Sequence, residues 1–103
     1  MTYELINEIL TQLGIPYTYY QFKDSPTGDK YIAYFDMEKQ RFLADNKVYH
    51  HEEAFAVELY TKTKDIETEE ALIELFDQYE VAWSGGASTW IDSEQMYQTV
   101  FYC

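Results

Sequence analysis

The segment Ala54-Phe55-Ala56-Val57-Glu58-Leu59-Tyr60 decides the fold of this chain. Its larger apolar side chains, Phe55, Val57 and Leu59, occupy every second position, and a period of two places them together on one face of a β-strand. The alternate positions, Ala54, Ala56, Glu58 and Tyr60, form the second face. Because this is the clearest alternation in the sequence, we predict that the segment is a central strand of a sheet.

Two amphipathic helices are predicted, one before and one after this strand. Residues 2–13 carry apolar side chains at the spacing of one helical face, with Thr2 placed to cap the first turn and Gly14 and Pro16 placed to end the helix. Residues 65–79 form the second helix, with Asp65 or Thr68 as its cap. The side chains expected to face inward from the second helix are Leu72, Ile73, Leu75, Phe76 and Tyr79.

The remaining extended segments complete a sheet. We predict strands at residues 17–22, 30–37, 81–83, 89–91 and near 96–102, with short extended pieces at 41–44 and 47–49 and a tight turn at Asp45-Asn46. The run Ser84-Gly85-Gly86-Ala87-Ser88 is interpreted as a hairpin loop, with glycines supplying positive φ angles. The short connections favour an antiparallel arrangement. The prediction is therefore one α+β domain over residues 1–103, a mostly antiparallel sheet of about five to six strands carrying two amphipathic helices.

Composition sets limits on the function. The chain has 103 residues, with 7 Lys and Arg against 19 Asp and Glu, a formal charge of −12. That charge disfavours direct binding to DNA or RNA, which requires cations along a phosphate backbone. No run of about eighteen apolar residues exists, and the first residues lack a secretory signal pattern. We expect a soluble protein that does not enter a membrane and works inside the cell that makes it or inside a particle assembled there.

Residues that could carry chemistry do not form an active-site pattern. His50 and His51 would point to opposite faces of an extended segment, so they do not supply the ligand set of a metal site. The glycines at 85 and 86 are followed by a Trp-containing segment instead of the helix that a phosphate cradle requires. Cys103, the one cysteine, has no basic neighbour in sequence and is interpreted as an incidental terminal thiol. We predict no enzymatic activity, no catalytic residue, no metal and no cofactor.

Aromatic content indicates a protein surface for assembly. Eleven Tyr and two Trp exceed what a domain of this size comfortably buries, and these residue types concentrate at interfaces. The strands at 30–37 and 96–102 are apolar on both faces, whereas two helices are expected to cover only one. We therefore predict self-association through the sheet or its edges. The predicted interface residues are Tyr31, Ile32, Tyr34, Phe35, Met96, Tyr97, Val100 and Phe101.

Three runs resemble a known family. They are Ala44-Asp45-Asn46-Lys47-Val48-Tyr49, Val57-Glu58-Leu59-Tyr60-Thr61-Lys62-Thr63-Lys64-Asp65 and Trp90-Ile91-Asp92-Ser93-Glu94-Gln95-Met96-Tyr97. They are similar to the head-tail connector, tail completion and tail terminator proteins of tailed phages and prophages of Gram-positive bacteria. The likeness extends over almost the whole chain. It departs at residues 84–88, which look longer and richer in Gly, and at Cys103, where the last strand is expected to run further.

The resemblance implies a virion protein without enzymatic activity, assembled in the host bacterial cytoplasm. It implies an α+β subunit of a ring, commonly hexameric, at the top of the tail tube, with tail-tube and connector proteins as partners. An acidic wall would let DNA pass through without binding it. The loop Asp24, Ser25, Pro26, Thr27, Gly28 and Asp29 is a candidate for docking such a partner.

The sequence also permits a second hypothesis about function. The chain could be a small acidic inhibitor or immunity protein that mimics nucleic acid and occupies a basic site. It would use acidic side chains of the second predicted helix, namely Glu67, Glu69, Glu70, Glu74 and Asp77. Such a protein would be a monomer or dimer.

Overall fold

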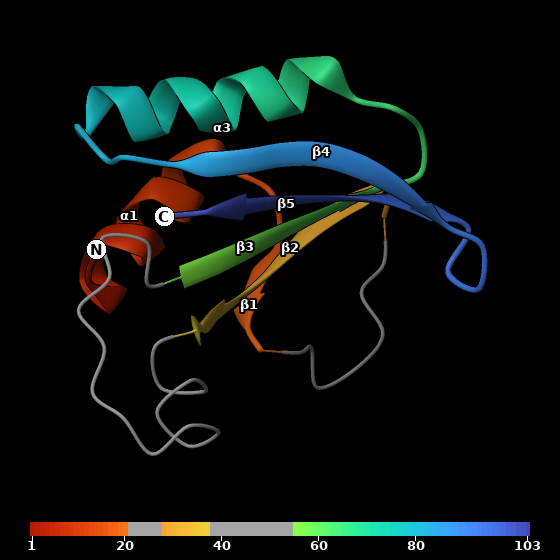
Figure 1. Ribbon diagram of the computed structural model, residues 1–103, viewed down its shortest axis with the longest axis horizontal. Helices are drawn as coiled ribbons and strands as arrows, with labels where there is room; N and C mark the ends of the chain where they lie inside the picture. The colour runs from red at the N-terminus through yellow and green to blue at the C-terminus, as the bar shows by residue number, and fades with distance from the viewer. Residues whose placement is uncertain (21–27, 38–54) are drawn as a thin grey trace.

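The computed structural model describes residues 1–20, 28–37 and 55–103, and it has two helices and five strands there. In chain order these are α1 (Tyr3–Leu13), β1 (Tyr17–Tyr19), β2 (Lys30–Asp36), β3 (Phe55–Thr61), α3 (Ile66–Gln78), β4 (Ser84–Ile91) and β5 (Met96–Tyr102). The strands form one sheet in the order β1-β2-β3-β5-β4 (Figure 1). The prediction of an α+β fold with a mostly antiparallel sheet is confirmed, with five strands. The predicted central strand is confirmed over residues 55–60, which belong to β3, whereas Ala54 lies outside the described residues.

Helix α1 begins and ends where its sequence requires. The Thr2 hydroxyl oxygen accepts a hydrogen bond from the Leu5 amide at 3.1 Å, which satisfies one of the unpaired amides of the first turn. Gly14 closes the helix with φ of +82°, and its amide donates to the Leu10 carbonyl at 3.3 Å. The helix therefore stops one turn before β1, as the sequence predicts.

Helix α3 begins at the cap that the sequence offers. The Asp65 carboxylate accepts hydrogen bonds from the Thr68 amide at 3.1 Å and from the Thr68 hydroxyl at 2.8 Å. Leu72 and Phe76 are fully buried, one helical turn apart. Ile73, Leu75 and Tyr79 pack partly buried against the same core, which confirms the predicted inward face.

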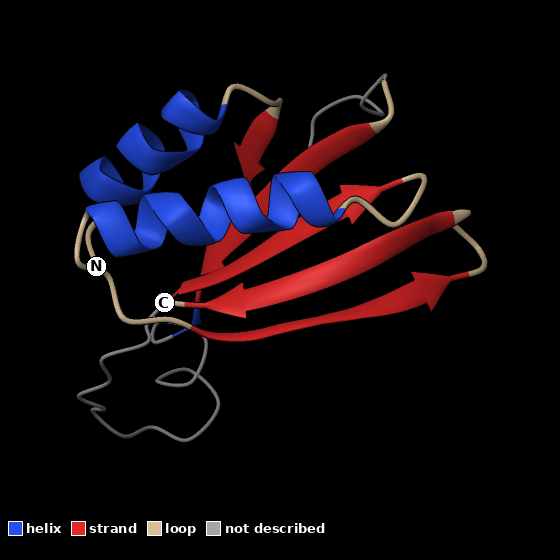
Figure 2. Cartoon of the chain, turned by 90° about the horizontal axis from the view of Figure 1, so that it is seen from above, coloured by secondary structure: helices blue, strands red, loops and turns tan. Residues whose placement is uncertain are grey.

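Both helices lie on the same face of the sheet (Figure 2). Residues from α1, α3 and the three strands β2, β3 and β5 share one core under them. Its buried members are Ile6, Ile9, Leu10, Ile32, Tyr34, Phe55, Val57, Leu59, Leu72, Phe76, Phe101 and Cys103. Within the described ranges, no helix lies against the opposite face of the sheet, which is the arrangement that the sequence predicts.

One strand pair differs from the expected arrangement. β1 pairs parallel with β2, with Tyr17 opposite Ile32 and Tyr19 opposite Tyr34. A parallel pair needs a connection that returns the chain to the end at which the first strand began, and the segment between Tyr19 and Lys30 is longer than a hairpin turn. β1 is also shorter than the predicted strand at 17–22, because Tyr20 adopts φ of +72°.

The glycine-rich run is a strand with a bulge. Strand β4 (Ser84–Ile91) pairs with β5 on both sides of a register irregularity between Gly85 and Ser88, and the hairpin turn lies at residues 92–95 instead. The predicted loop at 84–88 and the predicted strand at 81–83 are therefore wrong. The glycines do have the expected positive φ angles, +89° and +92°, but these serve the bulge and not a turn.

Several expectations fall outside the described residues. These are the short strands at 41–44 and 47–49, the turn at Asp45-Asn46 and the pair His50-His51. None of the helices that the structure describes has the length and apolar character needed to cross a membrane.

Candidate functional site

The candidate site is the face of the sheet opposite α1 and α3, which we call the distal face. The alternation of β3 produces it, because Phe55, Val57 and Leu59 point to the helices and the intervening residues point away. The antiparallel register carries this division to both neighbouring strands. The distal face consists of Tyr31, Ala33 and Phe35 from β2, Ala56, Glu58 and Tyr60 from β3, and Met96, Gln98, Val100 and Tyr102 from β5.

Aromatic rings dominate the distal face. Tyr31 and Tyr60 lie opposite each other on β2 and β3 and stack with ring centroids 5.0 Å apart and planes 19° apart. Phe35 meets the exposed ring of Tyr20 edge-on at 6.2 Å. Ring pairs of this kind add to the stability gained from area burial alone and leave large, rigid contact surfaces for a partner.

A short chain of hydrogen bonds crosses the distal face. Gln98 donates from Nε2 to the Tyr60 hydroxyl at 2.9 Å, and that hydroxyl donates to Glu58 Oε1 at 2.9 Å. Burial is the main cause that raises the pKa of Tyr60, to about 12. The phenol is therefore a neutral donor at physiological pH, and it holds the Glu58 carboxylate in one place.

The predicted interface residues divide between the two faces of the sheet. Tyr31, Phe35 and Val100 are on the distal face and partly exposed, and Met96 is there too, opposite Ile91 and only 6% exposed.

Three of the predicted interface residues require correction. Ile32, Tyr34 and Phe101 point toward the helices, are at most 4% exposed and fill the core. Both faces of β2 and β5 are apolar, but the helices cover the middle of one of them. Those side chains hold the fold and do not reach a partner.

The two outer strands of the described sheet carry its most exposed aromatic side chains. At the β4 edge, Trp90 is 43% exposed and packs against Tyr97 with centroids 5.0 Å apart. At the β1 edge, Tyr19 and Tyr20 are 43% and 59% exposed. Tyr97 is the remaining predicted interface residue, and it belongs to this edge contact and not to the distal face. This division depends on strand order, so it could not be predicted from the sequence.

The helix layer is acidic. Neither α1 nor α3 contains Lys or Arg. Glu67, Glu70, Glu74 and Asp77 are exposed and follow one another at the spacing of a single helical face, as the sequence predicts. Glu69, a fifth predicted acid, turns inward, with its side chain 13% exposed.

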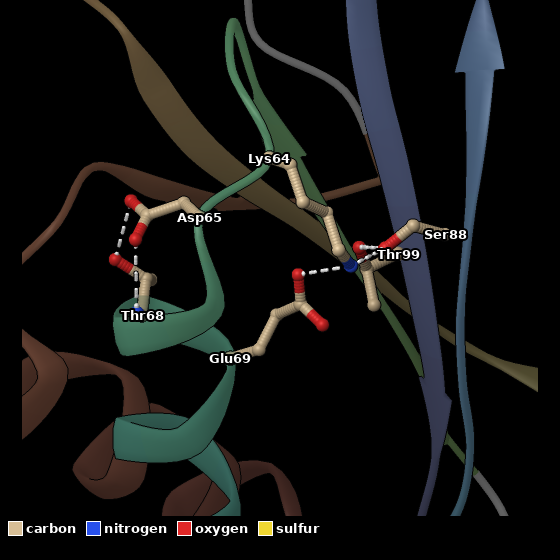
Figure 3. A network of polar contacts seen from close by, with 6 residues as sticks. All are labelled: Lys64, Asp65, Thr68, Glu69, Ser88 and Thr99. Atoms are coloured by element: carbon tan, nitrogen blue, oxygen red, sulfur yellow. Dashed lines mark hydrogen bonds and ion pairs between the residues drawn. The ribbon is translucent and has the colours of Figure 1, made fainter.

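A polar network ties α3 to the sheet, and it is structural (Figure 3). Lys64 Nζ lies 2.7 Å from Glu69 Oε2 and 2.6 Å from the Ser88 hydroxyl, which in turn lies 2.6 Å from the Thr99 hydroxyl. Lys64 thereby joins an acid of α3 to hydroxyl groups of β4 and β5.

The other candidate residues do not form a site in the described part of the chain. Cys103 is fully buried, and its backbone pairs with Phe55, with N–O distances of 2.7 and 2.9 Å. It is a core residue, which corrects its interpretation as an incidental thiol. No group of three or more metal-ligating side chains is found among the described residues. Of the predicted docking loop, Gly28 and Asp29 are described, whereas Asp24, Ser25, Pro26 and Thr27 lie outside the described residues.

Comparison with models of protein families, with curated proteins and with solved structures finds no match for this chain.

Proposed function

We propose that this chain is a non-enzymatic structural subunit of a ring in a tailed-phage virion, at the head-tail junction or the top of the tail tube. The sequence resemblance to tail completion, tail terminator and connector proteins supplies the biological setting. Other tail proteins are its partners, and a hexamer is the expected ring. The subunit is assembled in the bacterial cytoplasm and remains in the virion.

The observation that carries the proposal is the placement of exposed aromatic rings at the two opposite edges of the sheet. Trp90 lies at the β4 edge, packed on Tyr97 of the neighbouring strand β5, and Tyr19 and Tyr20 lie at the β1 edge. A ring of identical subunits requires a heterologous contact, in which one surface of each copy meets a different surface of the next. Two apolar patches on opposite edges supply such a pair of surfaces.

The acidic helix layer fits the same function. A carboxylate-rich surface directed to a channel repels phosphates and leaves DNA free to move. The three described lysines do not offset this charge, because each is paired within the chain: Lys30 with Asp65, Lys62 with Asp29 and Lys64 with Glu69.

The test is the mass of the protein in solution, measured by light scattering over a concentration series, followed by negative-stain imaging. We expect a closed ring for the natural sequence and smaller species for W90S and Y20S. The matched control is I66S, because Ile66 is 58% exposed but lies at the start of α3, away from both edges. A strict monomer at all concentrations, or equal loss of assembly in I66S, would contradict the proposal.

One observation favours the second candidate function. The four exposed acids Glu67, Glu70, Glu74 and Asp77 on α3 present a row of negative charge similar in kind to a phosphate backbone. An inhibitor that mimics nucleic acid would bind a basic nuclease or repressor as a monomer and lose affinity when these acids become Gln or Asn. The same light-scattering series separates the two functions.

A further inference from the structure

The middle of the distal face holds one charged side chain. Glu58 lies between Ala33 on β2 and Val100 on β5, and between Ala56 and Tyr60 along its own strand. It is the single ionisable carboxylate among the described strand residues that form this face. A second acid, Glu94, in the β4–β5 turn, is close enough to contribute to the raised pKa of Tyr31.

The surroundings of Glu58 hold its carboxylate in place without neutralising it. The Tyr60 hydroxyl donates to one carboxylate oxygen and is itself held by Gln98, so both contacts come from neutral groups. Tyr31 stacks on the Tyr60 ring, whose hydroxyl contacts the carboxylate. A carboxylate next to tyrosine rings suits a guanidinium, which binds carboxylate oxygens through two N–H groups and stacks on aromatic faces.

Any protein that covers this face must meet the charge of Glu58. A wholly apolar partner would bury the carboxylate without a counterion, which is strongly unfavourable. A second copy placed face to face would bring a second Glu58 without a counterion to the same interface, which is also unfavourable. The described lysines of a second copy are already paired with acids of their own chain, so they do not supply the missing charge.

We propose that the distal face docks a different protein through an arginine side chain that pairs with Glu58 and lies beside the Tyr60 ring, whose hydroxyl contacts the same carboxylate. The contacts proposed above between neighbouring subunits use the edges of the sheet, whereas this contact uses its distal face. The proposal therefore goes beyond the proposed function and does not depend on it. The docking segment presents its arginine among apolar side chains that pack on Phe35 and Val100.

The test is a titration of the full chain, labelled with nitrogen-15, with the peptide acetyl-Phe-Arg-Phe-amide. We expect amide shifts confined to β2, β3 and β5, and no binding of the peptide in which citrulline replaces arginine, because citrulline has the same shape without the charge. The E58Q variant should bind at least fivefold more weakly. The matched control E74Q removes an exposed charge from α3 and should bind as the natural sequence does.

Three results would overturn the proposal. One is equal binding of the citrulline peptide, which would show that the positive charge of the arginine does not contribute to binding. Another is equal weakening in E58Q and E74Q, which shows that only the net charge matters. The last is a face-to-face dimer that becomes tighter in E58Q, which identifies a second copy as the occupant. The citrulline comparison uses the natural sequence and stays informative if E58Q folds poorly, and light scattering on the same sample tests the ring separately.

Discussion

Replacing Gly85 with alanine tests whether residues 84–88 are a bulged strand or an exposed turn. Gly85 has φ of +89°, and a Cβ atom built there would lie 2.5 Å from the Val100 carbonyl oxygen and 3.2 Å from the Tyr102 ring. The first of these atoms belongs to the backbone of β5 and cannot move without disturbing the strand pair. In an exposed turn the same Cβ would point into water.

Two costs add at this position. An alanine at positive φ costs about 1–2 kcal/mol, and forcing extra atoms into a packed region costs about 1–3 kcal/mol. We expect G85A to lose roughly 2–5 kcal/mol of unfolding free energy, a large part of the 5–15 kcal/mol typical of a domain. Gly14 provides the control, since its φ is +82° and a Cβ there meets only the Gln12 carbonyl oxygen at 3.9 Å. G14A should therefore lose only the first cost, about 1–2 kcal/mol.

Equilibrium unfolding in urea, with both variants in parallel, measures the difference. G85A should show a midpoint clearly below that of G14A with an unchanged slope, because the surface exposed on unfolding stays the same. If the two variants are equally destabilised, the Cβ at residue 85 meets no backbone, and the bulge is not where we place it.

Two further predictions concern ionisable groups. Hydrogen bonds from Thr68, with a smaller contribution from Lys30, hold the pKa of Asp65 below its usual value. The stability that this carboxylate gives to the fold is therefore present above the pKa of the unfolded state and is lost as the pH falls through the pKa of the folded state. D65A should lose about 1 kcal/mol of unfolding free energy at neutral pH. In urea unfolding series run from about pH 5 to pH 2, this difference from the natural sequence should shrink. The control D77A, at an exposed position of α3, should change the unfolding free energy little. The pKa of Tyr60 is raised to about 12 by burial, so the stability linked to its neutral phenol is lost as pH rises from about 10 toward that value. Y60F should show a smaller loss over that range, and an equal loss would place the titrating group elsewhere.

The sequence predicted the elements whose determinants are local. Thr2, Gly14 and Asp65 act within one helical turn, so both helix starts and the first helix end are readable from neighbouring residues. The alternation of β3 likewise needs only its own residues. The parallel partner of β1 and the bulge in β4 were missed, because each depends on a strand distant in sequence.

The candidate surfaces show the same division. From composition and spacing alone, the chain had to be an acidic α+β domain with more aromatic rings than its core could hold. Strands β2 and β5 are apolar on both faces, so the sequence could not predict which of these faces the helices α1 and α3 would cover. Only the tertiary structure decided that Ile32, Tyr34 and Phe101 belong to the core, because the register with β3 fixes the direction of every side chain on its neighbours. The same register gathers Tyr31, Glu58 and Tyr60 onto one face, where three separate sequence positions become one surface.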